Sequence, residues 1–261
     1  MVVKARNLVN PGAPSDSQPR CIYGVHAVAE WVRNRPGELR AVHYEARAAA
    51  RLTGLLRAAT TAGVRVEPCS AGRLAGLVGP ARHQGVVATA APFPYAALEE
   101  VVAARPSLLI LADQMQDPQN LGALLRTAAA VGSGAVILPK DGSVPVTAVV
   151  EAAAAGAAAL LPVCRVTNAE RTLRILKDRG YWAWGLVPKH GVDLFRADPP
   201  QPLVVVVGGE SGIRNLVAKR CDTLVSIPMA GRVESLNAAV AAAIAMYHVR
   251  CQWGGLTETR P

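Results

Sequence analysis

Apolar runs without polar interruption recur through the second half of the chain, and the clearest is PLVVVVGG at 202–209. A strand has such a continuous apolar sequence when helices cover both faces of its sheet, which is the usual state of a parallel sheet. Similar runs are LLILAD, AVILPK, LLPVCRV, YWAWGLV and TLVSIPM, and helical stretches separate most of them. The alternation predicts an α/β domain with a parallel sheet over residues 107–252.

A second alternating pattern occupies residues 21–90. Its first helix is predicted within YGVHAVAEWVRN, where apolar residues recur at the helical period, and the rest alternates to give an α-β-α-β-α-β order. Residues 91–106 contain three prolines and are predicted to form a linker with a short helix. Residues 1–20, polar and proline-containing, are predicted to be a disordered arm, and residues 253–261 a tail.

Charge and cysteine content narrow the function classes. Lys and Arg outnumber Asp and Glu by 28 to 19, for a net charge of +9, which favours a phosphate-rich partner. The predominance of Arg over Lys could reflect either such a partner or a GC-rich genome. A GC-rich genome does not explain the net positive charge. The five cysteines are scattered without a C-x-x-C pair, so we expect neither a disulfide framework nor a metal site. With no secretory signal and no apolar stretch of membrane-spanning length, a cytoplasmic protein without a membrane partner is predicted.

Three segments of the larger domain depart from their local pattern. The first is DPQNLGALLRTAAAVG, in which Asp117 and Pro118 predict a helix start and Asn120 falls in the first turn. Arg126 is the only charged residue between Asp117 and Lys140. A charged residue in an apolar helix either extends its head to solvent or has a specific partner, and both readings stay open from the pattern alone.

The second segment is VVGGE, where a buried strand ends in two glycines followed by Glu210. Ligands in open α/β sheets bind beyond the carboxyl ends of the strands, and paired glycines allow a close backbone approach. The spacing is not that of a dinucleotide-binding loop. The third segment, SIPMAGRVESLNAAVA, leads from a strand into an Ala-rich helix that Ser235 is predicted to cap.

In this order and spacing, the three segments resemble the motifs of the SpoU/TrmH family of RNA 2′-O-ribose methyltransferases, over residues 107–252. IYGVHAVAEWV and HQGVVA resemble the start and end of the family's accessory RNA-binding domain, which is similar to a ribosomal protein. Within the family, the resemblance is to the type that methylates a guanosine of 23S rRNA. It implies a SPOUT fold with a deep trefoil knot, S-adenosyl-L-methionine as cofactor, RNA and not DNA as partner, and a homodimer with an active site formed across it.

The resemblance also assigns roles to individual residues. The catalytic set it implies is Asn120, Arg126, Glu210, Ser235 and Asn237. The cofactor contacts it implies are Gly208, Ile227, Met229 and Leu236, with no metal. The loop after Glu210 is one residue shorter than is usual in the family, and Glu210 is retained as the motif acid because it is correctly spaced from the strand. Arg126 is expected to ease deprotonation of the ribose hydroxyl or to position the ribose.

Other functions remain open. The same chemistry could act on tRNA or on an antibiotic-resistance site of rRNA, and a non-catalytic RNA-binding or ribosome-assembly protein could share the fold. A nicotinamide-dependent oxidoreductase is disfavoured because the glycine fingerprint is absent. In the smaller domain, the candidates for phosphate contacts are Arg33, Arg35, Arg40, Arg47, Arg51 and Arg57, and an ordinary solvated helix face is the alternative for part of this set.

Overall fold

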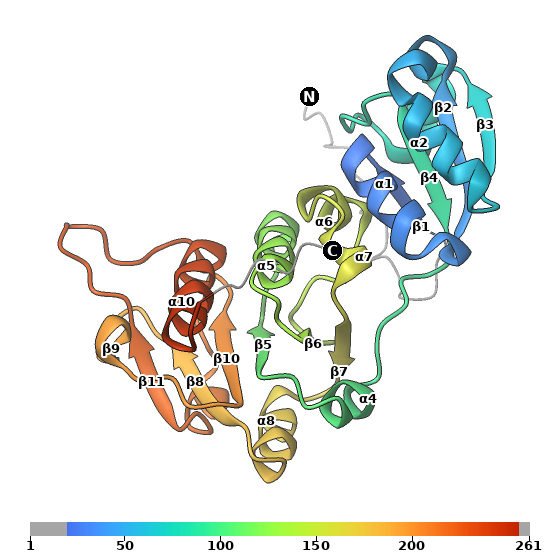
Figure 1. Ribbon diagram of the computed structural model, residues 1–261. Coiled ribbons are helices and arrows are strands. Elements are labelled where there is room, and N and C mark those ends of the chain that lie inside the picture. Colours follow the sequence, from blue (N-terminus) through green and yellow to red (C-terminus); the bar gives the residue numbers. More distant parts are fainter. Residues whose placement is uncertain (1–19, 256–261) are drawn as a thin grey trace, which may run out of the picture.

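A sheet of seven parallel strands forms the centre of the larger part of the protein, seen in a computed structural model that describes residues 20–255 (Figure 1). Its strand order is β7-β6-β5-β10-β8-β11-β9, and each neighbouring pair is parallel. The strands are β5 (Leu108–Asp113), β6 (Ala135–Pro139), β7 (Val163–Val166), β8 (Trp182–Leu186), β9 (Val192–Asp193), β10 (Leu203–Gly208) and β11 (Thr223–Ser226). The predicted α/β parallel-sheet fold is therefore confirmed.

Strand β10 shows why the sequence contains uninterrupted apolar runs. Leu203, Val205 and Val207 belong to the apolar cluster on one face of the sheet, whereas Val204 and Val206 belong to the cluster on the other face. Every residue of the strand is buried. Because both faces are covered, polar residues have no place at alternate positions.

Helices cover the two faces of the sheet and make a three-layered domain (Figure 1). One layer consists of α5 (Pro118–Ala130), α6 (Ala148–Ala153), α7 (Ala157–Leu160) and α10 (Ala238–Gln252). The opposite layer consists of α4 (Leu98–Ala103), α8 (Ala169–Asp178) and α9 (Asn215–Ala218). A short 3-10 turn η3 (Leu194–Arg196) packs beside α10 on the first face. Helix α4 is the short helix predicted between residues 91 and 106.

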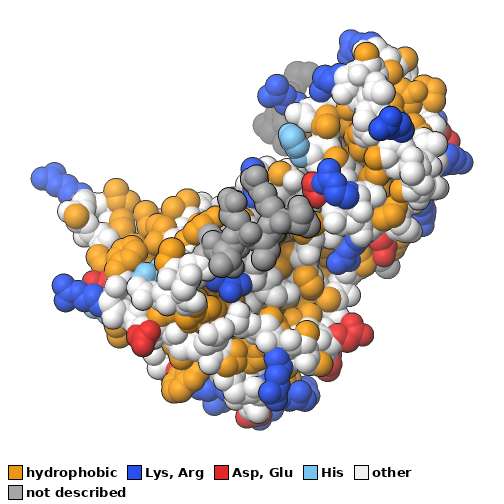
Figure 2. Space-filling model, viewed as in Figure 1, with side chains coloured by type: hydrophobic (Ala, Val, Ile, Leu, Met, Phe, Trp, Pro, Cys, Tyr) orange, Lys and Arg blue, Asp and Glu red, His pale blue; other side chains and the backbone are white. Residues whose placement is uncertain are grey.

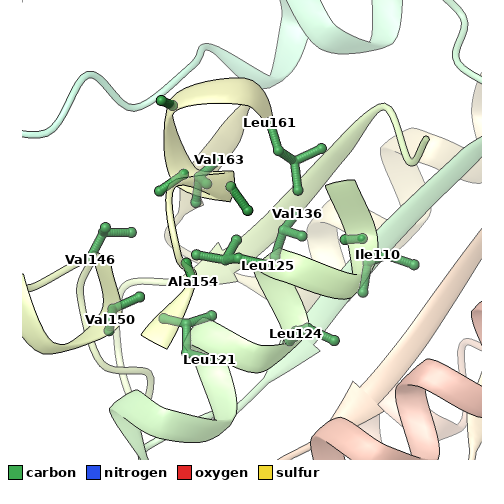
Figure 3. Packing of buried hydrophobic residues seen from close by; sticks show 14 of the residues in the cluster. Ile110, Leu121, Leu124, Leu125, Val136, Val146, Val150, Ala154, Leu161 and Val163 are labelled. Carbon is green, nitrogen blue, oxygen red and sulfur yellow. The ribbon is translucent and has the colours of Figure 1, made fainter. Parts of the chain in front are cut away.

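Helix α5 begins where the sequence predicted. The Asp117 side chain accepts a hydrogen bond from the backbone N–H of Gln119 at 2.9 Å, and Pro118 is the first helical residue. The chain leaves the helix through Gly132, whose φ of +69° suits glycine. Its apolar side packs on the sheet and on α6; the residues labelled in Figure 3 are Ile110, Leu121, Leu124, Leu125, Val136, Val146, Val150, Ala154, Leu161 and Val163.

The N-terminal part contains a four-stranded sheet of order β1-β4-β2-β3. Its strands are β1 (Arg20–Tyr23), β2 (Leu39–Glu45), β3 (Arg65–Cys69) and β4 (Val86–Ala90), and the pairs of β4 are antiparallel whereas β2 and β3 are parallel. Helices α1 (Val25–Asn34), α2 (Ala49–Thr61) and α3 (Ala71–Val78) and the turns η1 (Pro36–Glu38) and η2 (Ala46–Ala48) complete it.

Two strands were not predicted, β1 and β9. Both are too short to show a periodicity, and each is fixed by pairing with a distant segment. One continuous apolar cluster includes residues of both sheets, so the structure does not divide the chain at the predicted domain boundaries, which stay a prediction. The trefoil knot also stays a prediction. The predicted arm, except Arg20, and the end of the predicted tail lie outside the described residues. Within residues 20–255, none of the helices combines the length and apolarity needed to cross a membrane.

Gly122 allows α5 and α6 to pack closely, and this predicts the effect of a substitution. A Cβ atom at Gly122 would lie 2.3 Å from the Cβ of Ala153, so Gly122→Ala should lower the free energy of unfolding by about 1–3 kcal/mol. Gly54 is also helical but has open space around it, so Gly54→Ala should stabilise the protein by up to about 1 kcal/mol. Denaturant unfolding of both variants checks this, and equal effects would contradict the packing argument.

Candidate active site

Three polar side chains from distant segments form a hydrogen-bonded chain at one edge of the sheet. The Asn120 side chain donates to Glu210 Oε1 at 3.0 Å. The Asn237 side chain donates to Asn120 Oδ1 at 2.7 Å. Asn120 is buried, and the amide orientation follows from its two partners, one an acceptor and one a donor. The structure therefore brings together three of the five predicted catalytic residues.

The pairing of β5 with β10 places Asn120 next to Glu210. The two strands run in register, with Gly208 opposite Asp113, so their carboxyl ends lie at the same level. Asn120 lies in the first turn of the helix that follows β5, and Glu210 lies two residues beyond β10. Ligand sites in open α/β sheets form at this edge.

The two glycines before Glu210 are required by the chain's own backbone. A Cβ at Gly208 would lie 2.0 Å from the carbonyl carbon of Gly212, and one at Gly209 would lie 2.1 Å from the Gln114 carbonyl oxygen. The loop folds back as a tight bridge between Gly209 and Gly212. The paired glycines were expected to admit a ligand. In the structure, Gly208 lets this loop close on itself, and Gly209 lets it lie against the backbone of Gln114 after β5.

An ion pair fixes the far end of this loop. The buried carboxylate of Asp113, the last residue of β5, accepts the backbone N–H of Arg214 at 2.9 Å and the Arg214 Nε–H at 2.9 Å. Arg214 is thus used to hold the loop that carries Glu210. Neither residue was predicted to belong to the site, although an acid at the end of a buried strand is a usable signal.

Asn237, not Ser235, caps the Ala-rich helix. Its Oδ1 accepts from the backbone N–H groups of Ala239 at 2.9 Å and Val240 at 3.2 Å, and α10 begins at Ala238. The prediction of a Ser235 cap is wrong because the helix starts two residues later than expected. The Asn237 side chain therefore caps the N-terminus of α10 and also donates a hydrogen bond to Asn120.

A cavity of about 610 Å³ lies beside these residues, at the carboxyl ends of β8 and β10. Every predicted site residue except Arg126 lines it, namely Asn120, Gly208, Glu210, Ile227, Met229, Ser235, Leu236 and Asn237. Sequence reasoning missed Leu186, Val187, Pro188 and Ile213, which also line it. Its volume is within the range of sites for small molecules and cofactors.

Arg126 lies apart from the cavity. Its side chain is exposed on α5, and within residues 20–255 it makes no hydrogen bond or ion pair. It follows Asn120 by six positions, which at 3.6 residues per turn places it on a different side of the helix. The single chain therefore does not bring Arg126 to Asn120 and Glu210.

Neither thiol chemistry nor a metal centre is suggested by the described residues. Burial raises the pKa of both Cys164 and Cys221 to about 12, so neither is a thiolate near neutral pH. In residues 20–255, no group of His, Cys, Asp and Glu side chains is arranged to hold a metal ion.

Comparison with known proteins gives this site its context. The family model described as SpoU rRNA Methylase matches residues 107–247, and the one described as RNA 2′-O ribose methyltransferase substrate binding matches residues 21–96. The chain belongs to the SpoU rRNA methylase family.

Relatives of this SpoU family member match it over nearly their whole length. A 23S rRNA (guanosine-2′-O-)-methyltransferase RlmB from Ralstonia nicotianae is 44% identical over 236 residues, covering 88% of this chain and 95% of the relative. The RlmB of Xanthomonas axonopodis pv. citri is 41% identical, with the same coverage of 88% and 95%. The SpoU methyltransferase AviRb from Streptomyces viridochromogenes, solved in complex with AdoMet, superposes with a TM-score of 0.75 at 27% identity and covers 91% of this chain and 92% of its own.

The double role of Asn237 can be separated by two substitutions. Asn237→Ala removes the helix cap and should cost about 1 kcal/mol of stability. Asn237→Asp keeps the capping oxygen, so its stability should be near wild type, but it removes the N–H that Asn120 accepts. We expect Asn237→Asp to lose methyl transfer while its thermal unfolding stays close to wild type. Methyl transfer that stays near wild type in Asn237→Asp would argue that Asn237 is a cap alone.

Proposed function

We propose that the protein transfers a methyl group from S-adenosyl-L-methionine to the ribose 2′-hydroxyl of a guanosine in 23S rRNA. The observation that carries this is the chain of hydrogen bonds from Asn237 through Asn120 to Glu210 at the edge of a cofactor-sized cavity. The RlmB relatives support the choice of RNA and nucleotide, because they align over almost the whole chain. A ribosomal RNA substrate supports the proposal of a cytoplasmic enzyme.

The cavity fits the proposed cofactor. Ile227, Met229 and Leu236 offer apolar side chains, and Gly208 exposes backbone where a side chain is sterically excluded. A molecule with an apolar body and several polar groups is held by such a mixture of apolar wall and backbone. When bound, S-adenosyl-L-methionine supplies an activated methyl group, because the methyl is attached to a sulfonium that leaves as a neutral thioether.

The polar residues then have the task of placing the ribose. Asn120 holds Glu210 by a charge-assisted hydrogen bond, and Asn237 holds Asn120, so the carboxylate is fixed before substrate arrives. A fixed acceptor at the cavity edge can orient ribose hydroxyls for in-line attack. Ser235, exposed at the mouth of the same cavity, provides a further hydroxyl toward the RNA.

The proposed homodimer rests on α10 and Arg126. One side of α10 packs in the core through Ala242, Ala245 and Val249, yet Val240 and Tyr247 on other sides are 49% and 42% exposed. A helix that is apolar all round is normally covered on all sides. A second copy of this chain would cover it and could bring its own Arg126 to the cavity, since α5 and α10 are packed together.

A partner's Arg126 would supply what the single-chain cavity lacks. Among the residues that line the cavity, Glu210 is the only charged one. A guanidinium beside the ribose and its phosphate lowers the cost of removing the hydroxyl proton, because it stabilises the developing negative charge. Arg126 is thus proposed as a catalytic residue that acts across the dimer.

The N-terminal part is proposed to hold the RNA. Arg40 and Arg57 are exposed and Arg51 is exposed with one bond to the Gln84 carbonyl, so these remain candidates for phosphate contacts. Arg35 is different, since its Nε–H donates to the Ala159 carbonyl of α7 at 3.0 Å. Figure 2 shows basic side chains spread over this part of the surface.

The first test is substitution of the proposed cation. Arg126→Ala should reduce methyl transfer to rRNA by at least about a hundredfold, because a charge that stabilises the transition state is removed. Cofactor affinity should stay within about twofold, since the residue does not line the cavity in the single chain. Methyl transfer is measured with labelled S-adenosyl-L-methionine, and cofactor affinity is measured by calorimetry. Mapping of the modified nucleotide in the wild-type reaction distinguishes a 23S rRNA target from tRNA and from an antibiotic-resistance site. Near-normal turnover would remove Arg126 from the mechanism.

Mixing two inactive variants tests whether Arg126 acts across the dimer. When Arg126→Ala and Glu210→Ala are unfolded and refolded together, mixed dimers hold one cavity with a native Glu210 and the partner's native Arg126. Activity should return to at most about a quarter of wild type. If Arg126 acted on its own chain's cavity, every mixed dimer would be inactive. The control is each variant refolded alone.

A further inference from the structure

Glu151 is a fully buried acid that the reaction does not use. It lies on α6 of the catalytic part, and its two oxygens are bound by residues of the N-terminal part. Arg20 Nε donates to Oε1 at 2.9 Å, and Trp31 Nε1 donates to Oε2 at 2.7 Å. The Arg20 guanidinium also lies over the Trp31 ring, 4.4 Å from its centre. One carboxylate is therefore shared between the two parts of the protein.

The contacts around Glu151 are close and specific. Gly156, at the start of α7, has a φ of +96°, and a Cβ there would lie 2.5 Å from Cγ of Glu30 on α1. Arg35 donates to Ala159 in the same region. Trp31 packs edge-on against Phe93 of the connecting segment, 6.1 Å between ring centres. Helix α1 packs against α7, and strand β1 packs against α6 (Figure 1).

Helix α6 leads from this contact to the active site. It packs against α5 at Gly122, where the helices are close enough to exclude even a methyl group. Asn120, which holds Glu210, lies two residues before Gly122 on the same helix. The orientation of α1 is therefore transmitted to the residues of the cavity through two tightly packed helices, without a flexible segment.

We propose that Glu151 is a positioning residue that fixes the RNA-holding part at one orientation to the cavity and so determines which nucleotide of a structured RNA reaches the methyl donor. The proposal rests on the proposed function, because it concerns how that reaction selects its target. Neither Glu151 nor Trp31 has exposed surface, so neither can touch RNA itself.

A buried ion pair is suited to orientation more than to stability. Burial raises the pKa of Glu151 while the Arg20 charge and the Trp31 N–H act against that rise, so removing a carboxylate from water carries a real cost. Apolar residues of the same size often stabilise an interface as well or better. An ion pair with two directed hydrogen bonds, unlike an apolar contact, is satisfied at one relative orientation only.

The test compares two RNA substrates with the full-length enzyme. One is a folded 23S rRNA fragment large enough to contact both parts of the protein, and the other is a short hairpin that presents only the target nucleotide. The variants are Trp31→Phe, which removes one hydrogen bond and keeps an aromatic ring, and Glu151→Gln, which removes the charge. Their matched controls are Trp182→Phe, at a 51% exposed residue, and Glu170→Gln, in the surface pair with Arg220.

For both interface variants, kcat/KM on the folded fragment should fall about tenfold, with methylation at neighbouring nucleotides. On the hairpin, kcat/KM should stay within about twofold of wild type, and so should the Kd for S-adenosyl-L-methionine. Equal losses on both RNAs would show that Glu151 only stabilises the fold and would overturn the proposal. The proposal would also be overturned if Trp31→Phe kept the wild-type ratio of kcat/KM between the folded fragment and the hairpin. If the wild-type enzyme methylated neither RNA, the proposed function itself would fail.

Discussion

The in-register pairing of β5 with β10 is the constraint on which the site depends. These two central strands are buried along their whole length, and they end at the same level with Asp113 opposite Gly208. The helix after β5 then places Asn120, and the loop after β10 places Glu210. Asp113 closes the arrangement, because it binds Arg214 at the far end of that loop. A slip of the register would separate the two segments and with them the hydrogen bond between Asn120 and Glu210.

The third segment joins the site through a capping interaction. Asn237 satisfies the free N–H groups at the start of α10 with its oxygen and contacts Asn120 with its nitrogen. An amide is the side chain that can do both, because it carries an acceptor and a donor on one rigid plane. The position of the whole helix is therefore tied to the orientation of Asn120. This explains how segments 90 and 117 residues away from Asn120 converge at one point.

Much of this could be predicted from the sequence, for identifiable reasons. The long strands were evident because burial on both faces leaves an unbroken apolar run, and the start of α5 was evident because Asp117 and Pro118 are specific signals. The cap of α10 was placed wrongly since Ser235 and Asn237 are both good caps and local pattern does not choose between them. The Asp113–Arg214 pair and the contacts of Glu151 join residues more than 100 positions apart, and no local pattern reveals such pairs.

The proposed homodimer accounts together for the exposed apolar side of α10, for the charge of the cavity and for Arg126, which has no ion-pair partner among residues 20–255. The residues that line the cavity include a carboxylate, two carboxamides and two hydroxyls but no cation, although an RNA brings phosphates to its mouth. Electrostatic repulsion between Glu210 and a phosphate would oppose binding unless a positive charge joined them. The basic residue of the first motif is on the same chain yet faces away from Asn120 along α5. A second copy covering α10 would bring that charge without refolding the helix, so the site would be completed by assembly and would stay inactive in a lone chain.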